Sequence, residues 1–438
     1  MSAQVAQSSQ APRPLHVLII GGGIGGLCLA HGLKQAGISV ALYECDPSSG
    51  ARTQGYRIRI NPMGSRALAA CLPPHLYDAL VASCGRTPTA FTFITEQLDE
   101  VLSVRERRTS ATPDPIESHK SAHRQALRRI LLQGLDEIVH FDRTFARYEL
   151  TPEGKVTAFF TDGSQAVGDV LVGADGVHSR VRAQLLPQAQ HLDTGIRSIG
   201  SAIPLTDEVR ALLPQTLADG PANVLAPSGR SMFIAYQQFQ QPARDAELLS
   251  AVAAGDAENE RDYLLWAFSA RKETFPGADD LDQCDGQALR DRTLALVSRW
   301  HPHLQEIVRR SDPAIVTLLR IRTSVPVPPW PTTQVTVLGD AIHSMTPARG
   351  IGGNTALRDA ALLRDRLAAV QRGEQSLLPA IQEYETAMRA YGFAAVRSSL
   401  LAQEQAVADD PTALRRTKAT FRVLNLLPPL KRHVFRNI

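Results

Sequence analysis

The chain has 438 residues, of which 44% are hydrophobic and 5% aromatic, and its 47 Lys and Arg nearly balance 44 Asp and Glu, giving a net charge of +3. This length predicts two large or three smaller domains with a substantial core, and the balanced charge without a long basic run excludes a protein built chiefly to bind nucleic acid. Five scattered cysteines with no C-x-x-C pair argue against a disulfide framework or a metal site and favour a reducing compartment.

The N-terminal segment, residues 1–14, is rich in Ser, Gln, Ala and Pro and lacks the apolar region of a signal peptide. We therefore expect it to be a short disordered lead. No apolar stretch approaches the ~18 residues that a membrane-spanning helix needs. The sequence predicts a cytoplasmic monomer or homodimer that binds a small molecule, with at most a weak peripheral membrane contact.

The first structured element is expected at Leu15–Ile20, a continuous apolar run typical of a buried parallel strand. A glycine-rich turn, a helical pattern that ends at Gly37 and a second apolar strand over 38–43 follow. These elements predict a β-α-β unit, and the second strand ends in Glu44.

The turn of this unit carries the G-x-G-x-x-G pattern of dinucleotide-binding folds at Gly21, Gly23 and Gly26. Gly21 permits the tight turn, Gly23 lets a pyrophosphate approach the backbone, and Gly26 lets helix and strand pack closely. The Glu44 carboxylate can accept hydrogen bonds from ribose hydroxyls and would repel a 2′-phosphate. We therefore do not expect the stored nucleotide to be NADP.

Further along the chain, short apolar runs predict strands that alternate with a basic helix at 122–134. They end in the segment VLVGADGVHSRVR, an apolar strand followed by Asp175. The sequence pattern changes over 188–325. There, apolar runs such as 231–239 and 263–270 alternate with Gly-, Pro- and Asp-rich connections, and this alternation predicts an antiparallel sheet.

From Gln334 the first pattern returns, with a strand, Asp340, a glycine-rich loop and a long helix from about Asn354 to Arg372. The glycines place a second helix N-terminus where it can face an anion. Helices are also expected over 381–409.

These motifs in this order resemble the single-component FAD-dependent monooxygenases of group A, the p-hydroxybenzoate hydroxylase-like and salicylate hydroxylase-like family. The resemblance covers about residues 15–391 and is carried by G-x-G-x-x-G, the DG motif at Asp175 and the GD motif at Asp340. It implies an α/β fold: a Rossmann-like FAD-binding domain discontinuous in sequence, an inserted, mainly antiparallel substrate-binding sheet and a C-terminal helical segment. The expected boundaries are 15–85, 108–187 and 326–375 for the FAD-binding domain, 86–107 and 188–325 for the sheet, and 376–438 for the C-terminal helices.

The resemblance also implies roles for single residues at the FAD. Glu44 would bind the adenosine ribose, Arg124 would contact the cofactor, and Asp340 would bind the ribityl–pyrophosphate region. Gly353 and Asn354 would lie against the isoalloxazine, and Asp175 would serve both FAD and the transient nicotinamide cofactor.

Three residues depart from the family pattern. Cys45 stands where the family often has arginine after the ribose-binding acid. In the cofactor-lining segment GYRIRINP at 55–62, Tyr56 and Arg57 are bulkier than the usual small residues. Beside the cofactor, Tyr56 and Arg57 could close the pocket or reach an acidic substrate.

The chemistry implied by the family uses NADH or NADPH to reduce the flavin and O₂ to form a C4a-hydroperoxyflavin. This species would hydroxylate or epoxidise a hydrophobic aromatic or polycyclic molecule, as in secondary metabolism. The sequence has no second G-x-G-x-x-G for a resident nicotinamide domain. A flavin-dependent halogenase remains an alternative, although its W-x-W-x-I-P motif is absent, and so does a non-oxygenating FAD reductase or redox protein.

The remaining candidates concern catalysis and the substrate site. Residues that alternate on the predicted strands either line the substrate site or simply form core; they are Met232, Ile234, Tyr236, Trp266 and Phe268. Tyr236 has a hydroxyl that could polarise a phenol. Arg349, in the loop 347–350, could assist hydride delivery or substrate binding. His343 is expected to hold its loop. Segment 421–435 mixes apolar residues with Lys431, Arg432 and His433. It is expected to pack on the FAD domain, with contact to a membrane or a lipophilic substrate as the alternative.

Overall fold

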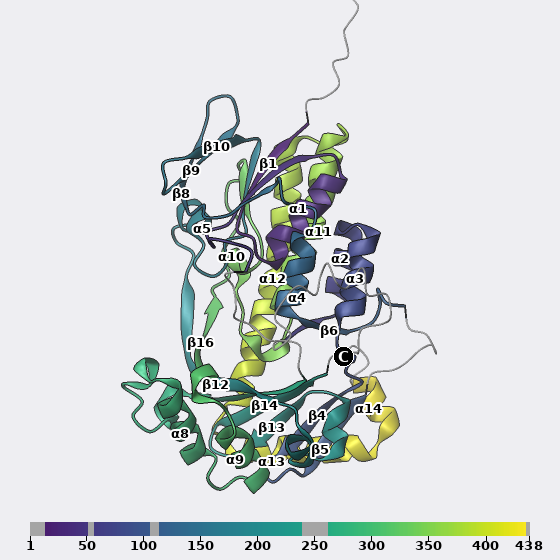
Figure 1. The fold of residues 1–438 in the computed structure, drawn as a ribbon, viewed down its shortest axis with the longest axis vertical. Coiled ribbons are helices and arrows are strands. Elements are labelled where there is room, and N and C mark those ends of the chain that lie inside the picture. The colour runs from purple at the N-terminus through teal and green to yellow at the C-terminus, as the bar shows by residue number, and fades with distance from the viewer. Residues whose placement is uncertain (1–13, 51–56, 106–113, 239–261, 435–438) are drawn as a thin grey trace, which may run out of the picture.

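The computed structural model describes residues 14–50, 57–105, 114–238 and 262–434. The molecule is elongated, with a parallel sheet and its helices at one end and a larger sheet at the other (Figure 1). Nearly all of the predicted N-terminal lead, and Tyr56, lie outside the described residues.

The first sheet has five strands, all parallel, in the order β17-β11-β1-β2-β7. Its central strand carries the sequence HVLII and is almost completely buried, because helices cover the sheet and continuous apolar runs offer no polar face to water. The strands are β1 (His16–Ile20), β2 (Ser39–Tyr43), β7 (Val139–His140), β11 (Val170–Gly173) and β17 (Val335–Val337).

Helices α1 and α11 pack against each other beside this sheet, and α11 also contacts α2 (Figure 1). The helices of this part are α1 (Ile24–Gln35), α2 (Pro62–Cys71), α3 (Pro74–Ser83), α4 (Arg124–Leu132), α5 (Arg180–Leu185), α10 (Asp340–His343) and α11 (Gly352–Gln371). Two small antiparallel sheets complete it: β3 (Arg57–Ile60) with β6 (Lys120–His123), and β8 (Phe145–Leu150) with β9 (Val156–Phe160) and β10 (Gln165–Gly168).

The second sheet has seven strands in the order β16-β12-β15-β14-β13-β4-β5 and is antiparallel except for the β13–β4 pair. Its strands are β4 (Ala90–Thr95), β5 (Glu100–Arg105), β12 (His191–Pro204), β13 (Ala222–Ala226), β14 (Arg230–Gln237), β15 (Tyr263–Arg271) and β16 (Thr317–Ser324). Trp266 and Phe268 of β15 lie in a core with Trp300 and Leu304 on the face toward α8 (Gly286–Leu296) and α9 (Pro302–Arg309). Short helical segments α6 (Asp207–Ala211), η1 (Gln215–Asp219), η3 (Lys272–Thr274), η4 (Leu281–Gln283) and η5 (Pro313–Ile315) connect these elements.

The C-terminal helices join the two ends of the molecule. Helix α12 (Leu377–Ala406) begins beside the parallel sheet, where the Tyr384 hydroxyl donates to the Val337 carbonyl at 2.9 Å, and runs toward the larger sheet (Figure 1). Helix α13 (Pro411–Leu426) packs on β5, and α14 (Pro428–Val434) follows it. Segment 421–435 was expected on the FAD-binding part, but the ring of Phe421 lies 4.9 Å from that of Phe93 of β4.

The predicted fold class is confirmed: a Rossmann-like unit discontinuous in sequence, an inserted, mainly antiparallel sheet and C-terminal helices. The predicted domain boundaries stay a prediction. Helices α8 and α9 within the inserted region were not predicted. Within the described ranges, no helix combines the length and hydropathy that a bilayer crossing requires.

Candidate active site

The turn between β1 and α1 has one open position between two crowded ones. Gly21 has φ of 110°, and a Cβ on Gly26 would lie 2.2 Å from the Gly21 carbonyl oxygen, so helix and strand touch there. A Cβ on Gly23 would meet no described atom within 4 Å. Gly23 precedes the first residue of α1 and lines a large cavity. The free N–H groups of this helix N-terminus are therefore open to an anionic ligand such as a pyrophosphate.

Glu44 follows β2 and is fully buried by the protein, yet it borders the same cavity. Its Oε2 accepts a hydrogen bond from the Gly22 N–H at 2.6 Å and its Oε1 from the Asp46 N–H at 2.9 Å. These two bonds orient the carboxylate at the edge of the cavity. The Cys45 thiol donates to Glu44 at 3.2 Å, and exposed Arg124, the first residue of α4, lines the cavity.

Asp175 connects this site to a short helix. Its Oδ2 accepts hydrogen bonds from the N–H groups of Arg180 (2.8 Å) and Val181 (3.2 Å). Its Oδ1 is buried and has no partner among the described residues. Burial raises the pKa of Asp175. Asp175 thus orders the start of α5 and also lines the cavity.

The N-terminus of α11 forms the opposite wall. Asp340 is exposed to the cavity, and Gly352 and Gly353 line it beside Asp340. Asn354 is only 1% exposed and points behind this wall: its Oδ1 accepts from the Asn61 N–H at 2.8 Å and its Nδ2 donates to the Arg59 carbonyl at 2.8 Å. Asn354 therefore joins α11 to the β3–α2 connection, and Gly353 is the residue of the pair that a ligand can touch.

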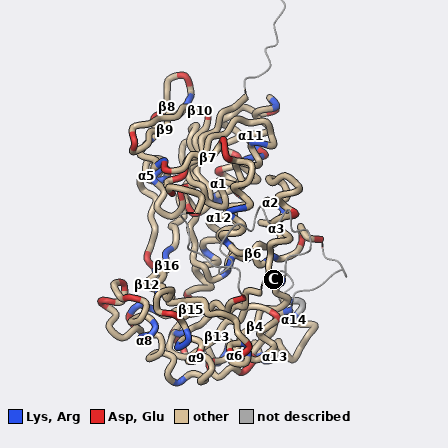
Figure 2. Tube along the Cα trace, viewed as in Figure 1, with Lys and Arg blue, Asp and Glu red and all other residues tan. Residues whose placement is uncertain are grey.

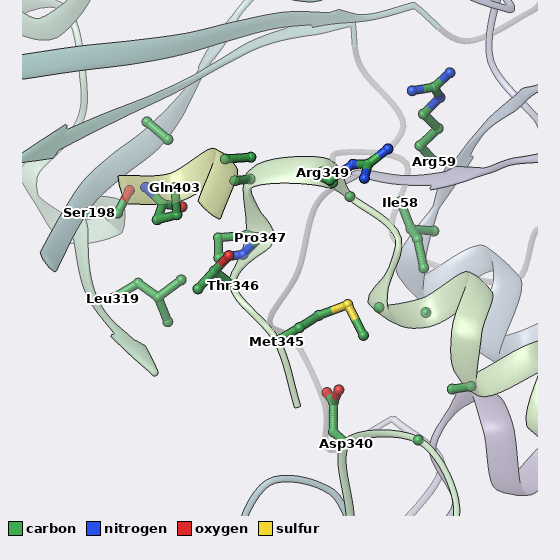
Figure 3. Close-up of a pocket in the computed structure, with 18 of the residues that line it drawn as sticks. Ile58, Arg59, Ser198, Leu319, Asp340, Met345, Thr346, Pro347, Arg349 and Gln403 are labelled. Atoms are coloured by element: carbon green, nitrogen blue, oxygen red, sulfur yellow. The ribbon is translucent and has the colours of Figure 1, made fainter. Parts of the chain in front are cut away.

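One cavity of about 1380 Å³ extends from the glycine turn past α11 to the face of the larger sheet. Pockets for one drug-sized ligand measure roughly 300–1,000 Å³. The volume is large enough for a dinucleotide and a second molecule together. Figure 3 shows Ile58, Arg59 and Arg349 on one side of this region and Ser198, Leu319 and Gln403 on the other.

Of the two alternatives for the alternating residues of β14 and β15, the structure shows core packing, and the neighbouring positions of each strand face the cavity. Ser231, Phe233, Leu265, Ala267 and Ser269 line the cavity, whereas Met232, Ile234, Trp266 and Phe268 lie in the core behind the sheet. Tyr236 packs against that core and is not among the cavity-lining residues. The structure therefore does not bring Tyr236 to the cavity, because alternate residues of a strand point to opposite faces.

Three hydroxyls form a row across this face. Ser231 pairs in register with Ser269, and Ser269 pairs with Ser198. The Ser269 hydroxyl donates to the Ser198 hydroxyl at 3.0 Å. Aromatic side chains also border the cavity: Phe233 on β14, and Phe91, Phe93 and Phe421 toward the β4 side of the sheet. The sheet face thus presents small polar groups to the cavity, with aromatic side chains to one side of them.

Two predicted arginines also line the cavity. Arg349 is exposed and lies in the segment η6 (Pro347–Arg349) before α11. Arg57 donates through Nε to the Ser121 hydroxyl at 2.6 Å, and its Nη2 has no partner among the described residues. Burial lowers the pKa of Arg57 to about 10, so the guanidinium stays charged near neutral pH.

His343 is fully buried and is not among the cavity-lining residues. Its Nε2 lies 2.6 Å from Oδ2 of Asp359, which also accepts from the Gly339 N–H at 2.8 Å, and Tyr391 donates to Asp359 Oδ1 at 2.5 Å. Burial alone would lower the pKa of His343, but the charge of Asp359 and its hydrogen bond outweigh burial and raise it. These contacts support the structural role expected of His343.

Sequence reasoning missed the cavity residues of the C-terminal helices. Gln403 of α12 lines the cavity, as do Leu414, Thr417 and Phe421 of α13. Their spacing of three and four residues marks one face of a helix. This pattern was visible in the sequence, but it does not say which surface the helix covers.

Two family models match parts of the chain. An NAD(P)-binding Rossmann-like domain matches residues 19–80, and an FAD binding domain matches residues 286–399. Both matches overlap the glycine-rich turns that border the cavity.

Curated relatives and a solved structure align over most of the chain. The dual O-methyltransferase/FAD-dependent monooxygenase elcB of Phaeosphaeria nodorum is 33% identical over 374 residues, which cover 80% of this chain and 40% of the relative. The FAD-dependent monooxygenase phnB of Penicillium herquei is 30% identical over 383 residues, covering 85% and 86%. A structure of an FAD-containing monooxygenase from Photorhabdus luminescens is 35% identical with a TM-score of 0.79, covering 90% of this chain and 98% of that one. The chain spans less than half the length of elcB.

Proposed function

We propose that this chain uses NADH or NADPH and O₂ to hydroxylate or epoxidise a hydrophobic aromatic or polycyclic small molecule. The chain belongs to the group A FAD-dependent monooxygenases. It is an oxidoreductase with FAD as its cofactor. The observation that carries the proposal is the continuous cavity, which joins the glycine turn and the α11 N-terminus to the floor of the larger sheet.

The residues along the first part of this cavity fit an FAD. The open backbone at Gly23 would hold the pyrophosphate at the N-terminus of α1, and Glu44 would accept hydrogen bonds from the ribose. The exposed Asp340 carboxylate would bind hydroxyls of the ribityl chain. Gly353 would lie against the isoalloxazine, where the N-terminus of α11 favours negative charge on the ring. Bound FAD supplies the reductive activation of O₂.

Three further residues complete the proposed cofactor contacts. Arg124 would approach the nucleotide from α4, and Asp175 from the opposite side of the glycine turn. Arg57 would face the ring side of the cavity with its position fixed by Ser121. Asn354 would act through its bonds to Asn61 and Arg59, which hold α11 and β3 in place, rather than by touching the ring.

The second part of the cavity would orient the substrate and exclude water. A planar ring system would lie on the small side chains of β14 and β15, with Phe91, Phe93 and Phe421 beside it. Burying the reaction in this way keeps bulk water from the activated oxygen. The exposed Arg349 would assist hydride delivery or bind an acidic group of the substrate.

The test is the oxidation of NADH and NADPH by the holoenzyme with a panel of naphthols, naphthoquinones and hydroxylated anthraquinones. At least one member is expected to stimulate nicotinamide oxidation and to yield a product heavier by one oxygen atom. Stimulated oxidation that returns every panel member unchanged, with the electrons passing to another acceptor, would favour a reductase and overturn the proposal.

A further inference from the structure

Helix α13 has an inner face toward the cavity and an outer face toward solvent. Its inner face lines the cavity through Leu414, Thr417 and Phe421. It is fixed there by Lys418, which pairs with Glu96 at 3.1 Å, and by Asn425, whose Nδ2 donates to Glu100 at 3.2 Å. The outer face of the same helix is therefore held in one orientation toward solvent.

The outer face and the following helix expose large aliphatic side chains. Leu426 is 80% exposed, and four others within the same twelve residues are about half exposed: Val423, Leu427, Leu430 and Val434. Exposed large hydrophobic residues elsewhere in the described chain are scattered singly along other elements. A cluster of this kind marks an interaction surface.

The same face is basic. Arg415, Arg416 and Arg422 are exposed and form no ion pair with a described residue. In a helix, Arg415, Arg422 and Leu426 follow one stripe, and Arg416 lies in the next stripe with Val423. The arginines therefore share one side of α13 with Val423 and Leu426, and the other exposed aliphatic residues follow at its C-terminal end and in α14.

The charge of the chain is concentrated in this segment. Residues 411–438 contain seven Lys and Arg and no Asp or Glu, so the remaining residues hold 40 basic against 44 acidic side chains. Over the rest of the described chain, Figure 2 shows basic and acidic residues interspersed. The net positive charge of the protein thus resides in the segment that also exposes the aliphatic cluster.

We infer that the outer face of α13 and α14 docks on an anionic lipid surface. The arginines match phosphate-bearing headgroups, and the leucine and valine side chains enter the boundary between headgroups and acyl chains. Because the inner face of α13 borders the substrate cavity, docking places that cavity next to the bilayer, from which a hydrophobic molecule can enter. This last step rests on the proposed function, whereas the docking does not.

The test uses the holoenzyme in co-sedimentation with phosphatidylcholine vesicles that contain or lack phosphatidylserine. Binding is expected only with phosphatidylserine and should weaken as salt is added. The triple variant Arg415→Gln, Arg416→Gln, Arg422→Gln should lower the partition coefficient by roughly 100-fold. The variant Leu426→Glu with Leu430→Glu should also lower it, whereas Leu378→Glu, 41% exposed at the opposite end of α12, should not.

Retained flavin absorbance in every variant shows that the fold is intact. Equal sedimentation with both kinds of vesicle, or binding that the arginine and leucine variants leave unchanged, would overturn the inference. So would a dimer in light scattering that Leu426→Glu dissociates without any vesicle binding, because a second copy would then cover the face. A failed oxygenation assay would leave vesicle binding unaffected, so the two proposals fail separately.

Discussion

Alanine at Gly26 should destabilise the fold, whereas alanine at Gly23 should weaken FAD binding, although the two glycines lie in the same turn. A Cβ on Gly26 would sit 2.2 Å from the Gly21 carbonyl oxygen and 3.2 Å from the Ala174 Cβ, so backbone must move. Overpacking of this kind costs about 1–3 kcal/mol or more. At Gly23 the backbone is extended, with φ of −77°, and no described atom lies within 4 Å of the position that a methyl group would take. Gly23 is also the N-cap of α1, where alanine is a poorer cap, and this offsets the ~0.4–1 kcal/mol gained by restricting the unfolded chain. Gly23→Ala should therefore change apoprotein stability by less than about 1 kcal/mol.

The methyl of Gly23→Ala enters the space assigned to the pyrophosphate. Losing one hydrogen bond to a charged group costs about 1.5–3 kcal/mol, so the Kd for FAD should rise by roughly 10- to 100-fold. Thermal unfolding of the apoproteins and titration with FAD, followed by flavin fluorescence, measure the two effects separately. A Gly23→Ala variant that binds FAD as the parent does, or whose apoprotein is destabilised as much as that of Gly26→Ala, would refute this account of the turn.

Three further predictions test other parts of the site. Asp340→Ala should release FAD on gel filtration with little change in apoprotein stability, because this exposed carboxylate faces the cavity; full retention of the yellow absorbance would contradict its assigned role. Tyr236→Phe should leave kcat unchanged, since Tyr236 packs on the core behind the sheet, and a large loss would return it to the catalytic candidates. Burial lowers the pKa of His31 from 6.5 to about 4. The neutral imidazole therefore stabilises the fold fully above pH 6.5, and about 3 kcal/mol of this stability is lost as the pH falls toward 4. His31→Gln should therefore flatten the pH dependence of the urea midpoint between these values, and an unchanged slope would exclude His31 as its source.

The parts of the site that depend on local sequence were predictable. Gly21, Gly23 and Gly26 lie between a continuous apolar strand and a helix, and this order is enough to predict a tight turn with a helix N-terminus open to an anion. Asp340 likewise begins a short helix shortly after the end of a buried strand. In both places the chemistry follows from neighbours within a few residues.

The substrate side depends on packing that the sequence does not specify. Side chains of β14 and β15 alternate between two faces as predicted. One face packs in the core with α8 and α9, and the other borders the cavity. Apolar side chains such as Phe233 and Trp266 therefore occur on both faces, and composition cannot tell which face meets the cofactor. The amphipathic pattern of α13 shows a buried face, but its docking on β5 is set by distant contacts such as Lys418 with Glu96.

We expect oxygen transfer to occur inside the cavity between the glycine turn and the larger sheet, and isotopic labelling shows where the added oxygen comes from. The holoenzyme, NADPH or NADH and a panel compound that stimulates its oxidation are incubated under ¹⁸O₂, and the product is analysed by mass spectrometry. One ¹⁸O atom is expected in each product molecule. A product whose added oxygen is unlabelled, and so comes from water, or a compound that has gained no oxygen at all, would contradict oxygen transfer from O₂.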